Sequence, residues 1–295
     1  MKRKVLVVLF VLALLVGLMI ASWAQQKNRG LKVFISVDME GVSGVIHWED
    51  VTRKGKDYDY FRRLMTLETN AAIEGALQAG ATEILVKDAH GSGRNILPEL
   101  LNKETQLIRD WSGRPLSMME AIDKSFDAVI FVGYHARAGT ADAVLDHTMT
   151  GSIYDLKLNG IVMPEAGINA AIAGYFDVPV VMIAGDDAII KQAKELLGNL
   201  ETVTTKWGIG EAARMLHPEK ARALIKEKTF KALKRIKDYK VYKLKPPYTM
   251  EITYTTAGRA KKAATIPYAK RTGDRSASFT SDDFIMVLRF METAL

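Results

Sequence analysis

The 295-residue chain contains no cysteine. It therefore forms no disulfide, and cysteine is excluded as a nucleophile, as a metal ligand and as a site of lipidation. Histidine is scarce, with five residues, and no spacing among them is as diagnostic as the HExxH motif of metallopeptidases. Any metal site must therefore be built from His, Asp and Glu residues that are distant in the sequence.

Long apolar runs are lacking except near the start of the chain. Basic residues 2–4 precede an apolar run at 5–20, and the small residues Ser22 and Ala24 follow it. This order is typical of a secretory signal peptide and predicts cleavage after Ala24. The alternative is an uncleaved membrane anchor, because residues 5–24 reach the roughly 20 residues that a span needs. Both interpretations predict an exported protein, periplasmic or extracellular.

Acidic residues are scarce in the last third of the chain. Residues 206–275 contain 19 Lys and Arg but 6 Asp and Glu. Such a region could indicate nucleic-acid binding, but its basic residues are interleaved with helix-forming Ala and Leu and no stacking aromatics recur. A solvated helical surface or a subunit contact is favoured, and no nucleic-acid partner is expected.

Four short β-branched runs are nearly continuous in apolar residues, at 32–37, 83–87, 128–132 and 179–184. Such runs are typical of strands buried on both faces of a parallel sheet. Helical patterns at 60–79 and 187–197 alternate with them. The sequence therefore predicts an α/β fold with a mostly parallel sheet flanked by helices.

The later segments depart from this alternation. Residues 154–163 alternate around Asn159-Gly160, which predicts a hairpin, and Pro164 with Glu165 opens a helix of small residues. Basic helices up to about Tyr239, a strand at 249–255 and a final helix follow. We expect a leader at 1–24, an α/β metal-binding catalytic domain at 30–205 and a smaller basic α+β region at 206–295.

Polar residues follow each of the four predicted strands: Asp38, Glu40, Asp88, His90, His135, Asp186 and Asp187. Because the carboxyl ends of parallel strands meet at one edge of a sheet, these side chains should converge there. Asp38 and Glu40, two residues apart on an extended segment, would repel each other unless a cation neutralised them.

Each candidate also has an ordinary structural explanation. Asp38 and Glu40 could belong to a turn, and His90 and His135 could be loop histidines. Glu165 begins a helix, where the helix dipole favours an acid in any protein.

The remaining histidines have different candidate roles. His147 follows Asp146 among small and polar residues and could act as a base, a nucleophile or a ligand. His47 could contact substrate, and His217 precedes a proline at a helix start, which favours a structural role. Acids and histidines together suit zinc, manganese or cobalt, and a carboxylate that bridges two ions is typical of two-metal hydrolases. The residues alone therefore indicate a metal-dependent hydrolase.

Five motifs occur in an order that resembles a known family. They are SVDMEGVSG (36–44), KDAHGSG (87–93), FVGYHARAG (131–139), DHTM (146–149) and LNG…PEAGINAAIAGYFDVPVVMIAGDD (158–187). In this order they resemble the M55 family of D-aminopeptidases, from about Leu31 to the end of the chain. The leader departs from the family pattern, so the physiological role need not be shared.

The resemblance implies a site and an activity. The family's ligands for two zinc ions (manganese or cobalt being possible substitutes) match Asp38, Glu40, His90, His135 and Glu165, and its catalytic histidine matches His147. The implied function is a zinc-dependent aminopeptidase acting on short peptides with N-terminal D-amino acids, in a ring-like homo-oligomer. Asp186 or Asp187 could hold the peptide's amino group. The alternatives are another metal-dependent hydrolase, an amidase or phosphoesterase, or an exported peptide- or metal-binding protein without turnover.

Overall fold

The computed structural model describes residues 30–295, so the predicted leader lies outside the described residues. Within this range no helix is both long and apolar enough to cross a membrane. A seven-stranded sheet has the order β3-β2-β1-β4-β7-β8-β9 and is parallel except for the β8–β9 pair. Its strands are β1 (Leu31–Val37), β2 (Ala81–Asp88), β3 (Gln106–Ile108), β4 (Ala128–Tyr134), β7 (Val180–Asp186), β8 (Glu201–Ile209) and β9 (Ala212–Met215). The predicted mostly parallel α/β fold is confirmed.

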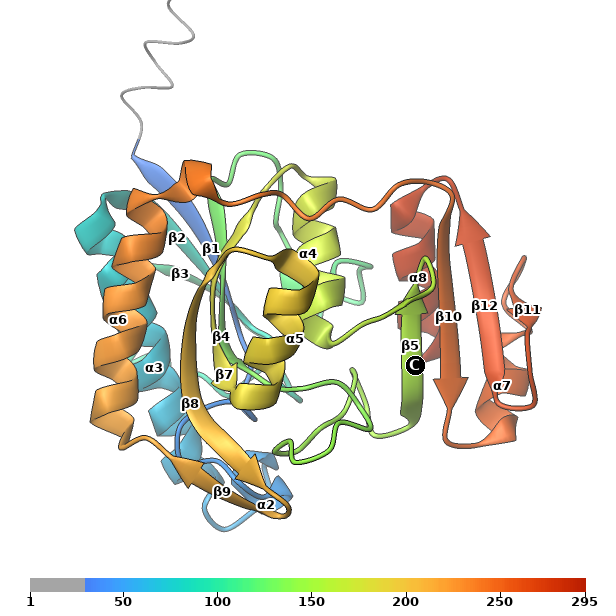
Figure 1. Ribbon diagram of the computed structural model, residues 1–295, viewed down its shortest axis with the longest axis horizontal. Helices are drawn as coiled ribbons and strands as arrows, with labels where there is room; N and C mark the ends of the chain where they lie inside the picture. The colour runs from blue at the N-terminus through green and yellow to red at the C-terminus, as the bar shows by residue number, and fades with distance from the viewer. Residues whose placement is uncertain (1–29) are drawn as a thin grey trace, which may run out of the picture.

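Helices cover both faces of this sheet (Figure 1). On one face lie α3 (Tyr58–Ala79) and α6 (Pro218–Lys234), and on the other α4 (Glu165–Tyr175) and α5 (Asp187–Leu197). Every residue of β4 and β7 is consequently buried, which explains why these strands are nearly continuous in apolar residues. The carboxyl ends of β1, β2, β4 and β7 therefore share one edge, where their polar loops meet.

A second, antiparallel sheet lies beyond α4 and α5 (Figure 1). Its order is β11-β12-β10-β5-β6, and α7 (Ala257–Ala263) and α8 (Phe284–Ala294) pack against it. The strands are β5 (Ile153–Leu158), β6 (Ile161–Val162), β10 (Tyr248–Tyr254), β11 (Lys270–Arg271) and β12 (Ser276–Ser281). The predicted hairpin is the β5–β6 pair, with positive φ at Asn159 (50°) and Gly160 (81°), as a tight turn between twisted strands requires. Three short segments complete the fold: α2 (Trp48–Val51), η1 (Ser117–Met119) and η2 (Ile236–Asp238).

The sheets divide the chain differently from the predicted boundary at residue 205. That position falls inside β8, which continues to Ile209 within the large sheet, and the next helix, α6, packs on α3. Conversely, β5 and β6 of the small sheet come from the part assigned to the catalytic domain. The Thr- and Lys-containing β8 (ETVTTKWGI) has no apolar run, so its membership of the sheet depends on pairing with β7.

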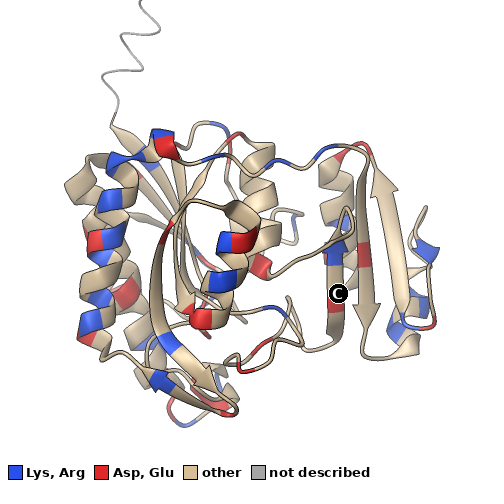
Figure 2. Cartoon of the chain, in the orientation of Figure 1, with Lys and Arg blue, Asp and Glu red and all other residues tan. Residues whose placement is uncertain are grey.

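The basic residues of α6 are partly paired with acids from earlier segments. Figure 2 shows Lys and Arg along α6. Lys226 lies 2.8 Å from Glu74 of α3, and Lys228 lies 2.8 Å from Glu201 of β8. The uneven charge of the sequence is thus partly balanced within the fold, and these contacts favour the interpretation as a helical surface.

Candidate metal centre

Asp38 and Glu40 lie in the turn that follows β1. Both carboxylates are buried, at 2% and 1% exposed. The amide of Gly41 donates to the carbonyl of Gly133 at 2.8 Å, and a Cβ at Gly133 would lie 2.1 Å from the Asp38 carbonyl. Glycine at 133, which also has a φ of +73°, therefore allows the end of β4 to approach this turn closely. The backbone carbonyl of Glu40 accepts from the buried ammonium of Lys206 on β8.

His90 lies in the loop after β2, and Asp88 holds that loop in shape. The Asp88 carboxylate accepts from the backbone amides of Asn95 (2.6 Å) and Ile96 (2.7 Å). Nε2 of His90 lies 2.9 Å from the carbonyl of Val51. A carbonyl only accepts, so the proton is on Nε2 and Nδ1 is left facing the site.

His135 and His147 follow β4, and each ring is likewise oriented by a hydrogen bond to a backbone carbonyl. Nδ1 of His135 donates to the carbonyl of Ala136, and Nδ1 of His147 to that of Leu145, both at 2.9 Å. Their rings are stacked 4.1 Å apart. In each ring Nε2 is therefore the atom that faces the site.

Glu165 is the first residue of α4 and is 4% exposed. One of its oxygens, Oε1, accepts from the amide of Met149 at 2.6 Å. The N-terminal position favours the ionised carboxylate because of the helix dipole, and His135 and His147 lower its pKa despite the burial that raises it.

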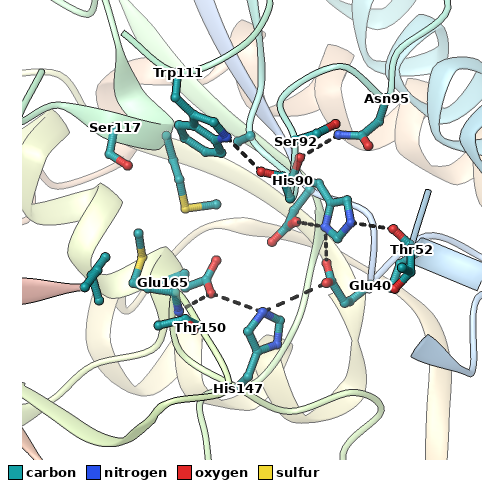
Figure 3. A pocket seen from close by; sticks show the side chains of 18 of the residues that line it. Glu40, Thr52, His90, Ser92, Asn95, Trp111, Ser117, His147, Thr150 and Glu165 are labelled. Atoms are coloured by element: carbon teal, nitrogen blue, oxygen red, sulfur yellow. Dashed lines mark hydrogen bonds and ion pairs between the residues drawn. The ribbon is translucent and has the colours of Figure 1, made fainter. Parts of the chain in front are cut away.

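The six side chains converge on one place, and Figure 3 shows Glu40, His90, His147 and Glu165 around it. Nδ1 of His90 lies 3.0 Å from Glu40 and 3.3 Å from Asp38. Nε2 of His135 lies 3.4 Å from Asp38 and 3.5 Å from Glu165. His147 lies between Glu165 and Glu40, with Nε2 at 3.7 and 3.9 Å from their oxygens. Three overlapping groups of these residues are each compact enough to hold a metal ion: Asp38, Glu40 and His90; Asp38, His135 and Glu165; Glu40, His135 and His147.

Three buried carboxylates are concentrated in this cluster. Burial and the neighbouring charge of Glu40 raise the pKa of Asp38. Burial also acts to raise the pKa of Glu40, but His90 outweighs it and the net pKa lies well below the usual value. Within residues 30–295, the only ion pairs of these acids are with histidines. Uncompensated buried charge is strongly unfavourable, so the cluster requires bound cations or protonated histidines.

The donor atoms fit a metal ion. Each of the three imidazoles donates one N–H to a backbone carbonyl and presents its other nitrogen to carboxylate oxygens. Asp38 Oδ2 and His135 Nε2 are both buried without a hydrogen-bond partner. Histidines with one N–H tied to a carbonyl are typical of metal ligands, because this bond fixes the tautomer and the ring orientation. The residues present therefore suit a nitrogen- and oxygen-liganded divalent metal.

The cluster forms one wall of a cavity of about 830 Å³. Asp38, Glu40, His90, His147 and Glu165 line it, whereas His135 is buried behind them at 1% exposed. Trp48, whose ring centroid lies 5.2 Å from that of His147, and Trp111 also line the cavity. A volume of this size accommodates a small-molecule ligand.

The family model for the M55 D-aminopeptidases matches residues 31–293. The chain belongs to this family. A D-aminopeptidase from Bacillus subtilis (strain 168) is 39% identical over 267 residues, which span 88% of this chain and 95% of that relative. The solved structure of the zinc-dependent D-aminopeptidase DppA from Bacillus subtilis, described as a self-compartmentalizing protease, matches with a TM-score of 0.86 at 35% identity. The match covers 90% of this chain and 96% of the DppA chain.

The structure brings together all six residues that the family resemblance selected, and their roles remain proposals. Other sequence candidates lie elsewhere. His47 and His217 are the N-caps of α2 and α6. Asp186 caps α5, and Asp187 accepts from the amide of Gly208. Neither Asp lines the cavity, which argues against their suggested role of holding a peptide amino group.

Several cavity-lining residues were not selected from the sequence. Trp48, Arg53 and Lys54 come from α2 and the loop after it, Trp111 follows β3, and Glu292 belongs to α8. None belongs to a strand-end motif, and α8 is part of the other sheet's layer. No local pattern marks such residues as neighbours of the cluster.

Lys206 should act as a positioning residue for the turn that carries Glu40. Its ammonium donates to the carbonyls of Glu40 and Val45 while the side chain is fully buried. We expect Lys206→Met to weaken zinc binding about tenfold, since partners that orient ligands typically contribute 10- to 100-fold. Competition with a chelating dye measures this affinity. Lys191→Met, an exposed site on α5, is the control, and equal affinities of both variants would contradict the role.

Titration of Glu68 in α3 should make the free energy of unfolding depend on pH. Burial raises its pKa from 4.5 to about 7, although the Ser43 amide bonded to it acts in the opposite direction. The folded protein thus retains this proton where the unfolded chain has lost it. The resulting stabilisation is fully present below pH 4.5 and is lost as the pH rises to about 7, at about 1.4 kcal/mol per pH unit.

Substitution of Glu68 by Gln keeps an oxygen for the Ser43 amide and removes the titration. The free energy of unfolding of Glu68→Gln relative to wild type should therefore rise between pH 4.5 and 7, by about 3 kcal/mol at most. Urea denaturation of metal-free protein measures the difference. Glu99→Gln, at an exposed position, should show no such slope; a flat difference for Glu68→Gln would refute the assignment.

Proposed function

We propose that the chain is a zinc-dependent aminopeptidase that releases N-terminal D-amino acids from short peptides. The observation that carries the proposal is the orientation of the three imidazoles, whose free nitrogens all face buried carboxylates. Membership of the M55 family and the likeness to a zinc-dependent D-aminopeptidase support the choice of metal and substrate.

Asp38 supports the proposal of two zinc ions per chain. Its Oδ1 faces His90 at 3.3 Å and its Oδ2 faces His135 at 3.4 Å. Asp38 therefore belongs to two of the candidate ligand groups, the first completed by Glu40 and the second by Glu165. Asp38 would thus help to hold both ions, which in two-metal hydrolases supply the activation of water and of the scissile bond.

In this proposal His147 carries out the proton transfers. Its Nδ1–H is held by the Leu145 carbonyl, so Nε2 is free to accept a proton from an attacking water and return it to the leaving amine. The ions, when bound, supply Lewis-acid activation of the scissile carbonyl and of the water. Direct attack by His147 is the alternative, and trapping of an acyl-imidazole after acid quench would favour it.

Metal content and activity of the purified protein test the function together. We expect about two zinc ions per chain by elemental analysis, release of D-Ala from D-Ala-D-Ala, loss of this activity with a chelator, and recovery when zinc is restored. L-Ala-L-Ala tests the stereochemical preference and an aryl phosphate the alternative hydrolase. Cleavage of the phosphate alone, or binding of D-Ala-D-Ala without turnover by zinc-loaded protein, would refute the proposal.

Assembly and location form two further parts of the proposal. The description of the Bacillus subtilis structure as self-compartmentalizing supports a ring-like homo-oligomer. Size-exclusion chromatography with light scattering would detect such an oligomer as a mass several times that of one chain. The predicted leader supports export and a role in trimming D-amino-acid peptides released from cell walls. Cell fractionation and N-terminal sequencing distinguish cleavage after Ala24 from an anchor.

A further inference from the structure

The cavity beside the metal cluster carries charged side chains of opposite sign from separate parts of the chain. Glu292 comes from α8, which packs on the small sheet. Arg53 and Lys54 come from the loop after α2, which belongs to the large-sheet side. None of the three belongs to the candidate ligand set, so their charges are available to a molecule in the cavity.

Glu292 is a partly buried carboxylate without a cationic partner. Within residues 30–295 it forms no ion pair, and the groups that act on it are the Ser117 hydroxyl and the charge of Glu120. Burial raises the pKa of Glu292, and the charge of Glu120 adds to this effect. A cation placed next to Glu292 would therefore be stabilised there.

Arg53 and Lys54 are exposed side chains whose loop is held against the cluster. The carbonyl of Val51 accepts from His90 at 2.9 Å, and the amide of Gly55 donates to Thr52 at 2.7 Å. No carboxylate among residues 30–295 forms an ion pair with either cation. These two charges are thus located next to the His90 side of the site.

Neighbours of the acidic and basic groups lie on opposite sides of the cluster. Figure 3 shows Ser117, the neighbour of Glu292, on one side and Thr52, which precedes Arg53, on the other. Glu165, His147 and Glu40 lie between them. A short extended peptide bound with an amide bond near the cluster would direct its two charged ends towards these two sides.

We propose that Glu292 binds the α-ammonium of the substrate and that Arg53 and Lys54 bind its α-carboxylate, so that the cavity selects zwitterionic di- and tripeptides. This inference rests on the proposed peptidase function and names the residues that select its substrate. Peptides with a blocked end would leave one charged group without its partner. Long peptides would place their carboxylate beyond the basic residues.

Three ligands and three variants test the proposal. The ligands are D-Ala-D-Ala, its C-terminal amide and its N-acetyl derivative; the variants are Glu292→Gln, Glu292→Asp and the double variant Arg53→Gln/Lys54→Gln. We expect Glu292→Gln to raise KM for both D-Ala-D-Ala and the amide about tenfold, with kcat and zinc content little changed. The double variant should raise KM for D-Ala-D-Ala at least about threefold and leave the amide unaffected. Glu292→Asp should recover part of the loss.

Matched controls are Glu195→Gln and Arg63→Gln, which change the same residue types outside this cavity. A KM unchanged in Glu292→Gln, or an acid-to-amide preference retained in the double variant, would overturn the proposal. If wild type cleaves no peptide, the proposed function fails, but calorimetry still tests the inference. Binding of D-Ala-D-Ala that is weakened by N-acetylation and by Glu292→Gln supports it, and equal binding overturns it.

Discussion

Replacement of His147 by Ala should lower kcat for D-Ala-D-Ala by about 10³-fold, within the 10²–10⁴ range typical of a general acid-base residue. The reason is geometric: Nε2 is the only ring nitrogen of His147 left free by the bond to Leu145, and it faces the cavity between Glu40 and Glu165. Zinc content should remain near two per chain by elemental analysis, because the other five residues supply both ligand sets.

The zinc measurement also tests the alternative that His147 is a ligand. His147 forms a compact group with Glu40 and His135, so a metal-binding role is geometrically accessible. Loss of about one zinc ion in His147→Ala would favour that role, and unchanged kcat would refute any role in the reaction. The control is His217→Ala, which removes a histidine at the N-cap of α6, outside the cavity, and should leave kcat unchanged.

Asp38→Asn should abolish metal binding and activity together. The carboxylate faces His90 through one oxygen and His135 through the other, so both candidate ion positions lose a charged ligand at once. We expect zinc content to fall well below one per chain and kcat/KM to fall by more than about 10³-fold. Addition of zinc should no longer raise the melting temperature, since a ligand stabilises only a state that it binds.

In metal-free protein, Asp38→Asn should instead raise the melting temperature. Burial and Glu40 raise the pKa of Asp38, which reflects the unfavourable free energy of its ionised form in the absence of a cation. Metal-free Asp38→Asn should therefore melt at a higher temperature than metal-free wild type. Asp187→Asn is the matched control, because Asp187 also follows a strand of the large sheet but does not line the cavity. Retention of zinc and activity in Asp38→Asn would contradict the proposed centre.

The two effects would separate metal binding from chemistry. Loss of His147 should leave zinc in place and stop turnover, whereas loss of Asp38 should remove both. A protein that only binds metal or peptide would show no turnover for the His147 variant to lose. The pair of variants therefore distinguishes the proposed enzyme from an exported binding protein.

Much of the fold was predictable because its signals are local. The four apolar runs became β1, β2, β4 and β7, and the Asn159-Gly160 turn formed the β5–β6 hairpin. The selected residues after β1, β2 and β4 converged because parallel strands carry their carboxyl ends to one edge, whereas Asp186 and Asp187 after β7 do not line the cavity. Strand β8 was missed, since its polar sequence has no apolar run and joins the sheet only through pairing with β7 and β9.

The sequence by itself determined the alternation of strands and helices and the absence of cysteine ligands, and its resemblance to the M55 family selected the six residues of the candidate centre. Only the tertiary structure decided which nitrogen of each histidine faces the carboxylates, that β5 and β6 join the small sheet, and that Glu292 and Arg53 line the same cavity. Side-chain periodicity and turn chemistry act over a few residues and are readable along the chain. Contacts between groups more than 200 residues apart depend on how the two sheets pack, and no local pattern encodes that packing.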